Sequence, residues 1–241
     1  MNASRVVFIA ALSALVLGGP PAEAAKSKPN IVIVATGGTI AGSAKSETEA
    51  GYQSGAVAVD TLIEAVPQLE TLANVRGVQV ASIGSQDMND EVWLKLAKRV
   101  NELLASKDVD GIAITHGTDT LEETSYFLHL VVKSDKPVVM TGSMRPSTAM
   151  SADGPLNIYN AVAIAADPKA RGRGVLVTID DDVHSAHDLI KTHTTDVGTF
   201  SSNEAGLVGA VLFGATTWYR TPAQIHTAKS EMGIGDGKSL P

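Results

Sequence analysis

The chain alternates between short apolar runs and longer segments in which apolar residues recur every three or four positions. The short runs are rich in β-branched residues and end at glycine or polar residues, which is typical of buried strands. They span residues 31–36, 78–83, 111–115, 138–141 and 174–179. Helices are predicted over residues 59–66, 90–105, 121–132 and 154–166. This alternation predicts an α/β fold with a mostly parallel sheet sandwiched by helices.

Three of the predicted helices carry boundary signals. Pro67 ends the first helix, and Pro155 is acceptable in the first turn of the last one. Thr120 and Glu123 have the spacing of a capping box at the start of the helix over residues 121–132.

The pattern changes in the last quarter of the chain. Residues 181–204 are polar and frequently interrupted by turn-forming residues. Residues 206–213 and 216–219 predict the strands of a peripheral β-hairpin. Residues 229–241 are polar, contain glycines and lack apolar periodicity, so they predict a linker.

Polar loops follow four of the predicted strands. Because the carboxyl ends of parallel strands share one edge of a sheet, and ligands bind outside that edge, these loops predict one polar pocket. The loops are Gly37-Gly38-Thr39, Gly84-Ser85-Gln86-Asp87, His116-Gly117-Thr118-Asp119 and Gly142-Ser143-Met144-Arg145. Thr39 and Thr118 lie beside glycines, which let backbone and hydroxyl groups face a ligand together. The two threonines are therefore candidate nucleophiles.

A threonine hydroxyl becomes a useful nucleophile only when a neighbouring group takes its proton. The candidates are Lys191 and Tyr52, the latter in a glycine-flanked polar stretch typical of a mobile lid. The alternatives are a solvated surface lysine and an incidental loop tyrosine. Asp119 follows Thr118 at a predicted helix start, so it either complements the helix dipole or pairs with a substrate ammonium group or a lysine.

Spacing disfavours other kinds of site. The Thr36-Gly37-Gly38-Thr39 loop lacks both the dinucleotide-binding glycine pattern and the lysine of a P-loop. The imidazole and carboxylate groups of the segment 184–193 do not have the spacing of a standard zinc motif, so we expect no metal and a polar surface loop. These groups belong to His184, His187, Asp188 and His193. His116, at a strand end, is expected to be structural.

Composition narrows the possible functions. The 241 residues are 44% hydrophobic and 19% charged, which is ordinary for a globular protein. The formal net charge of −7 argues against nucleic acid or an anionic membrane as a partner. The chain contains no cysteine, which excludes disulfides, thiolate metal sites and cysteine catalysis.

The N-terminus has the pattern of a secretory signal peptide. Arg5 provides a positive charge, residues 6–17 form an apolar run too short to span a membrane, and Ala22-Glu23-Ala24 offers small residues to a signal peptidase. We therefore assign residues 1–24 to a signal peptide; the alternative is an uncleaved anchor. The mature protein is expected to be periplasmic or secreted and not held in the membrane.

Five motifs together resemble those of the bacterial asparaginase/glutaminase family. They are Ala35-Thr36-Gly37-Gly38-Thr39-Ile40-Ala41-Gly42, Gly84-Ser85-Gln86-Asp87-Met88-Asn89-Asp90, Ile114-Thr115-His116-Gly117-Thr118-Asp119-Thr120-Leu121-Glu122-Glu123-Thr124, Thr141-Gly142-Ser143-Met144-Arg145-Pro146 and Ser151-Ala152-Asp153-Gly154-Pro155. The resemblance covers nearly all of residues 29–228. With the signal peptide, the chain is most similar to the exported type II L-asparaginases, whose N-terminal domain is flavodoxin-like.

The resemblance implies hydrolysis of L-asparagine to L-aspartate and ammonia without a cofactor, with a varying activity on L-glutamine. Thr39 resembles the nucleophile and Tyr52 its hydroxyl partner in the lid. Thr118, Asp119 and Lys191 resemble a second catalytic cluster that transfers protons and stabilises charge. The implied substrate-binding positions are Gly38, Ser85, Gln86, Gly117, Thr118 and Asp119.

The resemblance also implies an assembly. In the family a C-terminal α/β domain follows a linker, forms part of an intimate dimer within a tetramer, and supplies a carboxylate to the partner's active site. We assign residues 25–228 to the N-terminal asparaginase domain and 229–241 to a linker remnant, with the C-terminal domain absent from this sequence. Three functional alternatives therefore remain: an active asparaginase, an impaired amino-acid-binding remnant, or one half of a split enzyme. A nucleotide-binding flavodoxin-like module is disfavoured.

Overall fold

The computed structural model describes residues 27–48 and 51–235. The predicted signal peptide lies outside the described residues, as does the end of the predicted linker. In the described part of that linker, Lys133 Nζ donates to the carbonyl oxygen of Ser230 at 2.6 Å, and Ile234 packs against the core. The division of the chain into an N-terminal domain and a linker stays a prediction.

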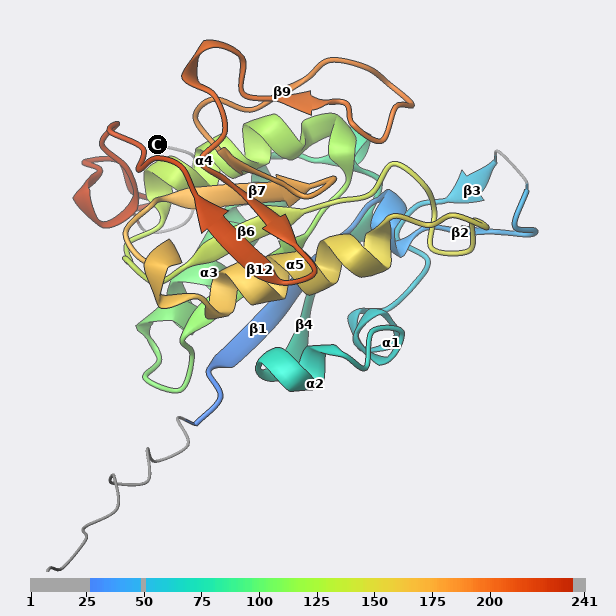
Figure 1. Cartoon of the computed structure of the whole chain (residues 1–241), viewed down its shortest axis with the longest axis horizontal. Coiled ribbons are helices and arrows are strands. Elements are labelled where there is room, and N and C mark those ends of the chain that lie inside the picture. Colours follow the sequence, from blue (N-terminus) through green and yellow to red (C-terminus); the bar gives the residue numbers. More distant parts are fainter. Residues whose placement is uncertain (1–26, 49–50, 236–241) are drawn as a thin grey trace, which may run out of the picture.

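An eight-stranded mixed sheet forms the centre of the fold (Figure 1). Its parallel strands are β1 (Asn30–Gly37), β4 (Asn74–Ile83), β5 (Gly111–Thr115), β6 (Val138–Thr141) and β7 (Val175–Ile179). Its antiparallel strands are β8 (Asp182–Ser185), β11 (Gly209–Leu212) and β12 (Ala215–Trp218). The peripheral hairpin predicted from the sequence is β11–β12, and it joins the sheet through β8.

The strand order explains where a ligand is expected. Across the sheet the order is β12-β11-β8-β7-β6-β5-β1-β4. When the five parallel strands are numbered along the chain, this is the flavodoxin-like order 2-1-3-4-5, which reverses between β1 and β5. The two threonine-bearing loops follow these two strands, so both lie at the switch point where α/β folds bind ligands.

Helices cover both faces of the sheet, as the alternating pattern predicts. One face packs against α1 (Val59–Glu64), α2 (Leu69–Leu72) and α5 (Gly154–Ala166). The other face packs against α3 (Asp90–Ala105) and α4 (Leu121–Val131). Figure 1 shows α5 crossing the near face of the sheet. Burial of the strands' side chains in two core clusters, one on each face, makes the sheet a rigid support for the loops at its edge.

Short 3-10 helices and two-residue strands build the loops around that edge. The 3-10 helices η1 (Thr39–Ala41), η2 (Ser85–Asp87) and η3 (Thr118–Thr120) follow β1, β4 and β5. The strands β2 (Ser43–Ala44) and β3 (Tyr52–Gln53) pair with each other, as do β9 (Ile190–Lys191) and β10 (Phe200–Ser201). The remaining 3-10 helices are η4 (Pro168–Ala170), η5 (Asn203–Ala205) and η6 (Thr227–Lys229). No helix within the described ranges has the length and apolarity needed to cross a membrane.

The segment after β7 differs from the expected surface loop. His184 lies in β8 and is fully buried, with Nδ1 2.8 Å from Ser202 Oγ. The chain reaches β8 through a tight turn at Asp180 and Asp181, which both have positive φ angles and so reverse the strand direction within two residues. His187 and His193 are exposed, as a surface loop requires. The expectation was therefore wrong for His184, because the turn places a polar strand inside the sheet, between β7 and β11.

Candidate active site

Two glycine-rich loops meet at the switch point of the sheet. Gly38 follows β1 and has a φ angle of 80°, and Gly117 follows β5. A Cβ atom on Gly38 would lie 2.3 Å from both the nitrogen and the Cα of Gly117. Only glycine at residue 38 allows this approach in this conformation. The backbones that carry Thr39 and Thr118 therefore pack directly against each other.

Thr39 begins η1 and is largely buried, with 8% of its surface exposed. Its Oγ1 lies 2.7 Å from Tyr52 Oη. Tyr52 comes from β3, and its ring lies against Gly42, where a Cβ atom would be 2.8 Å from Tyr52 Cδ2. The structure thus brings together the hydroxyl groups of the first predicted pair, and 41% of the tyrosine surface stays exposed.

Lys191 contacts the second threonine from 73 residues further along the chain. Its Nζ donates to Thr118 Oγ1 at 2.9 Å and to Asp119 Oδ1 at 2.7 Å. The lysine side chain is only 12% exposed, whereas the aspartate side chain is 62% exposed. Lys191 is therefore not a solvated surface charge, and Asp119 can face both the ammonium group and an incoming ligand.

Ser85 connects this cluster to the loop after β4. Its Oγ accepts a hydrogen bond from the backbone N–H of Asp119 at 3.1 Å, and its carbonyl oxygen accepts one from Thr120 Oγ1 at 2.9 Å. Thr120 is therefore not a capping-box residue: its backbone ends the 3-10 turn, and its hydroxyl points to another loop instead of the start of α4. Gln86 is exposed, and its side chain lies over Gly84.

The fourth strand-end loop, which follows β6, packs against the Thr118 cluster. A Cβ atom on Gly142 would lie 2.9 Å from Thr118 Cγ2, so this loop packs against the threonine. Asn157 Nδ2 donates to the carbonyl oxygen of Gly142 at 3.0 Å, and Asp153 accepts from the backbone N–H of Arg145 at 3.0 Å. The start of α5 thus holds the loop in place, and all four loops share one edge, as predicted.

His116 lies behind the Thr118 loop. It is fully buried, and its Nδ1 lies 2.6 Å from the carbonyl oxygen of Gly117, so Nδ1 carries the proton and donates it. Burial lowers the pKa of His116 from 6.5 to about 4. A neutral, hydrogen-bonded imidazole at this position agrees with the structural role expected for it.

Glu122 is a contact that sequence reasoning missed. Its carboxylate accepts a hydrogen bond from the backbone N–H of Lys191, 69 residues away. The sequence offered one signal: Glu122 stands three residues after Asp119, so the two carboxylates lie on the same turn. An acidic residue in the first turn of a helix is ordinarily explained by its favourable interaction with the helix dipole. The sequence therefore gives no reason to expect a further contact for Glu122.

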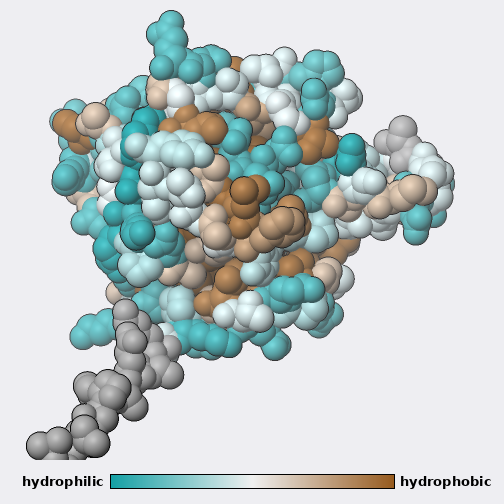
Figure 2. Space-filling view, in the orientation of Figure 1, coloured by the Kyte–Doolittle hydropathy of each residue, from teal (hydrophilic) through white to brown (hydrophobic). Residues whose placement is uncertain are grey.

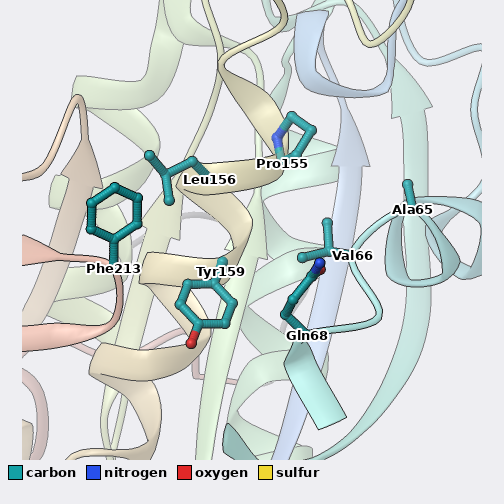
Figure 3. A pocket seen from close by; sticks show the side chains of 7 residues that line it. All are labelled: Ala65, Val66, Gln68, Pro155, Leu156, Tyr159 and Phe213. Carbon is teal, nitrogen blue, oxygen red and sulfur yellow. The ribbon is translucent and has the colours of Figure 1, made fainter. Parts of the chain in front are cut away.

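An apolar groove of about 450 Å³ lies elsewhere on the molecule (Figure 3). It is lined by Ala65, Val66, Gln68, Pro155, Leu156, Tyr159 and Phe213. Leu156 and Phe213 are 37% and 80% exposed, and Figure 2 shows hydrophobic residues gathered near the middle of this face. None of the predicted site residues lines this groove, so it does not belong to the candidate active site.

Comparison with protein families identifies the chain. A family model described as "Asparaginase, N-terminal" matches residues 30–224. The chain belongs to the asparaginase family. Its match covers all four strand-end loops as well as Tyr52 and Lys191. The asparaginase fold expected from the resemblance is thereby confirmed.

Individual asparaginases agree with this assignment. The chain is 54% identical to L-asparaginase 2 of Escherichia coli K12, over 96% of this chain and 65% of that protein. It is 58% identical to L-asparaginase 2 of Bacillus subtilis, over 90% and 58% of the two chains. A glutaminase-asparaginase of Pseudomonas fluorescens is 50% identical over 100% of this chain and 68% of its own.

A solved asparaginase structure shares the fold. It is the crystal structure of a probable cytoplasmic L-asparaginase from Campylobacter jejuni, with a TM-score of 0.86 and 48% sequence identity. The match covers 89% of this chain and 65% of that one. The chain thus spans less than two thirds of the length of this structure and of the E. coli and B. subtilis relatives.

Proposed function

We propose that this protein hydrolyses the side-chain amide of L-asparagine to L-aspartate and ammonia. The observation that carries the proposal is the pairing of two threonine hydroxyls with separate proton-handling groups on loops that touch. Thr39 pairs with Tyr52 at 2.7 Å, and Thr118 pairs with Lys191 at 2.9 Å. This is the arrangement of an activated nucleophile beside a group that can move its proton.

The first step forms an acyl-enzyme. Thr39 Oγ1 bonds to the amide carbon of asparagine, and its proton passes through the neighbouring hydroxyl and amine groups to the amide nitrogen. The carbon–nitrogen bond then breaks and ammonia leaves. Thr118 and Lys191 assist this proton transfer, because the lysine ammonium lies within hydrogen-bond distance of the threonine hydroxyl.

The second step releases aspartate. A water oxygen bonds to the acyl carbon, the ester bond to Thr39 breaks, and one water proton returns to the threonine oxygen. Backbone N–H groups of the glycine-rich loops stabilise the negative charge that develops on the carbonyl oxygen; that of Gly38 is not one of them, because it donates to the carbonyl oxygen of Ile83 at 2.8 Å. Each donor to the developing charge is typically worth about 3–4 kcal/mol in the transition state.

The substrate's α-carboxylate and α-ammonium groups are assigned to the loops on the other side of the pocket. Ser85 and Gln86 offer hydroxyl and amide groups for the carboxylate, and the exposed carboxylate of Asp119 is available to the ammonium group. L-glutamine, one methylene longer, is proposed as a secondary substrate.

Ammonia release from L-asparagine tests the function directly. The purified protein is compared with its Thr39→Ala variant as the blank, at equal concentration and with folding checked by circular dichroism. Activity above the blank is expected. A folded protein that binds L-asparagine in calorimetry yet releases no ammonia would instead be an amino-acid-binding protein.

We also propose that the protein is exported after cleavage near Ala24. The apolar run over residues 6–17 and the small residues at 22–24 support this proposal. A relative from Haemophilus influenzae, 54% identical, is named a probable periplasmic L-asparaginase. Mass spectrometry of the protein made in its own host gives the N-terminal residue, and an intact Met1 would contradict export by this route.

A homo-oligomer is proposed as the assembled form. Exposed apolar side chains around the groove support it, because contiguous apolar surface of this kind favours burial in a subunit contact. Sedimentation equilibrium measures the mass in solution, and a monomer at micromolar concentration would contradict the proposal.

A further inference from the structure

Lys191 is held at two points by one short stretch of chain. Its ammonium group bonds to Thr118 and Asp119, and its backbone N–H donates to the carboxylate of Glu122. Asp119 and Glu122 are three residues apart at the junction of η3 and α4, so both carboxylates lie on one side of the helix start. The same helix start therefore fixes both the side chain and the main chain of the lysine.

The segment that carries Lys191 is short, and its own hydrogen bonds join Thr192 and His193 to Thr199 rather than fixing the lysine itself. β9 contains two residues and pairs only with the two-residue β10. Ile190 is 41% exposed, and residues 192–196 are exposed. The nearest buried anchors in the core are Leu189 and Phe200, on either side of this segment. The main chain is therefore held on either side of Lys191, and at Lys191 itself the backbone N–H is held by Glu122.

We propose that Glu122 is a positioning residue, which holds the main chain of Lys191 so that its ammonium group stays between Thr118 and Asp119. A hydrogen bond to a charged acceptor is stronger than one between neutral groups. Keeping a reacting group in one orientation removes an entropic cost from the transition state. The inference rests on the proposed function only for this catalytic consequence, since the contact itself is independent of any substrate.

Glu123 separates this role from the ordinary role of an acid at a helix start. Both glutamates lie in the first turn of α4 and complement the helix dipole equally. Of these two glutamates, only Glu122 has a carboxylate that accepts a hydrogen bond from Lys191; Glu123 is exposed and its side chain makes no hydrogen bond to the lysine. Glu123→Ala is therefore the matched control for Glu122→Ala.

The first test measures the reactivity of the Lys191 amine without substrate. The protein is acetylated with a water-soluble succinimidyl ester, and the peptide that contains Lys191 is followed by mass spectrometry, with exposed lysines as an internal standard. Loss of the Glu122 contact is expected to accelerate modification of Lys191 about tenfold. This factor corresponds to the lower end of the free energy that a hydrogen bond to a charged group contributes. Glu123→Ala is expected to react like the wild type.

A conservative variant and kinetics complete the test. Glu122→Gln keeps an oxygen acceptor without the charge, so its rate is expected between those of the wild type and Glu122→Ala. In ammonia release, Glu122→Ala is expected to lower kcat about ten- to hundredfold while KM changes much less. If Glu122→Ala does not fold, Glu122→Gln carries both measurements.

The outcomes separate this inference from the proposed function. Wild-type Lys191 reactivity in Glu122→Ala, or equal acceleration in Glu123→Ala, would overturn the positioning role. An inactive wild-type protein whose Lys191 becomes reactive only in the Glu122 variants would overturn the asparaginase proposal and leave the positioning role intact.

Discussion

The two threonines occupy equivalent places at neighbouring strand ends, yet they are supported very differently. Thr39 has one side-chain partner, Tyr52, which is half-exposed. Tyr52 lies in β3, which pairs with β2 over only two residues. Thr118 contacts a shielded lysine that is itself tied to Asp119 and Glu122. The comparison indicates an adaptable half around Thr39, suited to opening for substrate, and a rigid half around Thr118, suited to holding protons and charge in place.

Removing either hydroxyl is the largest expected perturbation. Thr39→Ala and Thr118→Ala are each expected to lower the rate of ammonia release by about a thousandfold or more, because residues that act as one catalytic unit fail together. The melting temperature of each variant is expected to stay near that of the wild type, because each change removes one small group. Near-normal turnover in either folded variant would refute the role assigned to that threonine.

Gly38→Ala disrupts the backbone contact between the Thr39 loop and the Thr118 loop. The new methyl group would meet the backbone of Gly117, and residue 38 has a φ angle of 80°. The free energy of unfolding is expected to fall by about 2–5 kcal/mol, combining an extended conformation at positive φ, which essentially only glycine adopts, with overpacking. Urea denaturation measures the change.

Gly172→Ala is the control for Gly38→Ala. Gly172 has a φ angle of 73° and no neighbour within 4 Å of an added Cβ atom. A loss of only about 1–2 kcal/mol is expected, from backbone conformation alone. Equal losses in the two variants would show that the close contact between the loops adds nothing to stability.

The pH dependence of stability tests the half around Thr118, because His116 is buried behind the Thr118 loop. Its pKa is about 4 in the folded protein against an ordinary value of 6.5, so the unfolded chain binds the proton first as pH falls. The free energy of unfolding is therefore complete above about pH 6.5 and declines down to about pH 4, by up to about 3 kcal/mol from this group. Urea denaturation across this range shows the decline.

His116→Asn isolates the contribution of His116. The asparagine amide can donate to the carbonyl oxygen of Gly117 as the imidazole does, but it does not titrate. The decline in stability between pH 6.5 and 4 is expected to be shallower in this variant. An unchanged slope would assign the acid sensitivity to the other buried histidines, His129 and His184, whose pKa values are also lowered to about 4 by burial.

Tyr52→Phe gives the smallest expected effect and tests the adaptable half. The ring keeps its packing against Gly42, while the hydrogen bond to Thr39 is lost. The rate of ammonia release is expected to fall about ten- to hundredfold, with less than about 1 kcal/mol lost in stability. A larger loss of stability would mean that the tyrosine supports the fold as well as the threonine.

The sequence was most informative where apolar runs were continuous. The bounds of α3, α5, β5 and β6 agree with the predicted ones, because each element buries a regular set of apolar side chains. The start of β4 at Asn74 was missed because this edge strand begins with partly exposed residues. β8 was missed because Asp182-Val183-His184-Ser185 is not an apolar run, and α2 because it is a single turn.

The candidate site was predictable to a different extent in its two halves. The shared sheet edge follows from strand order, so the meeting of the Thr39 and Thr118 loops could be anticipated. The contact between Lys191 and Thr118 could not, since it depends on the antiparallel return through β8 and on the position of a two-residue strand. The sequence alone offered Lys191 only as one of two candidate partners for a threonine, and the family resemblance assigned it to the Thr118 cluster. For Glu122 there was only its spacing from Asp119, which does not indicate a contact with the lysine.

The separation of contacts along the chain adds a consequence for folding. Thr39 and Tyr52 are 13 residues apart, whereas Thr118 and Lys191 are 73 residues apart. Closing the longer loop costs about 1.5 kcal/mol more chain entropy. It also requires the whole sheet up to β8 to be assembled, while the shorter loop needs only the first strand and its hairpin. Protection of the lysine amine from solvent therefore reports that the sheet has assembled as far as β8.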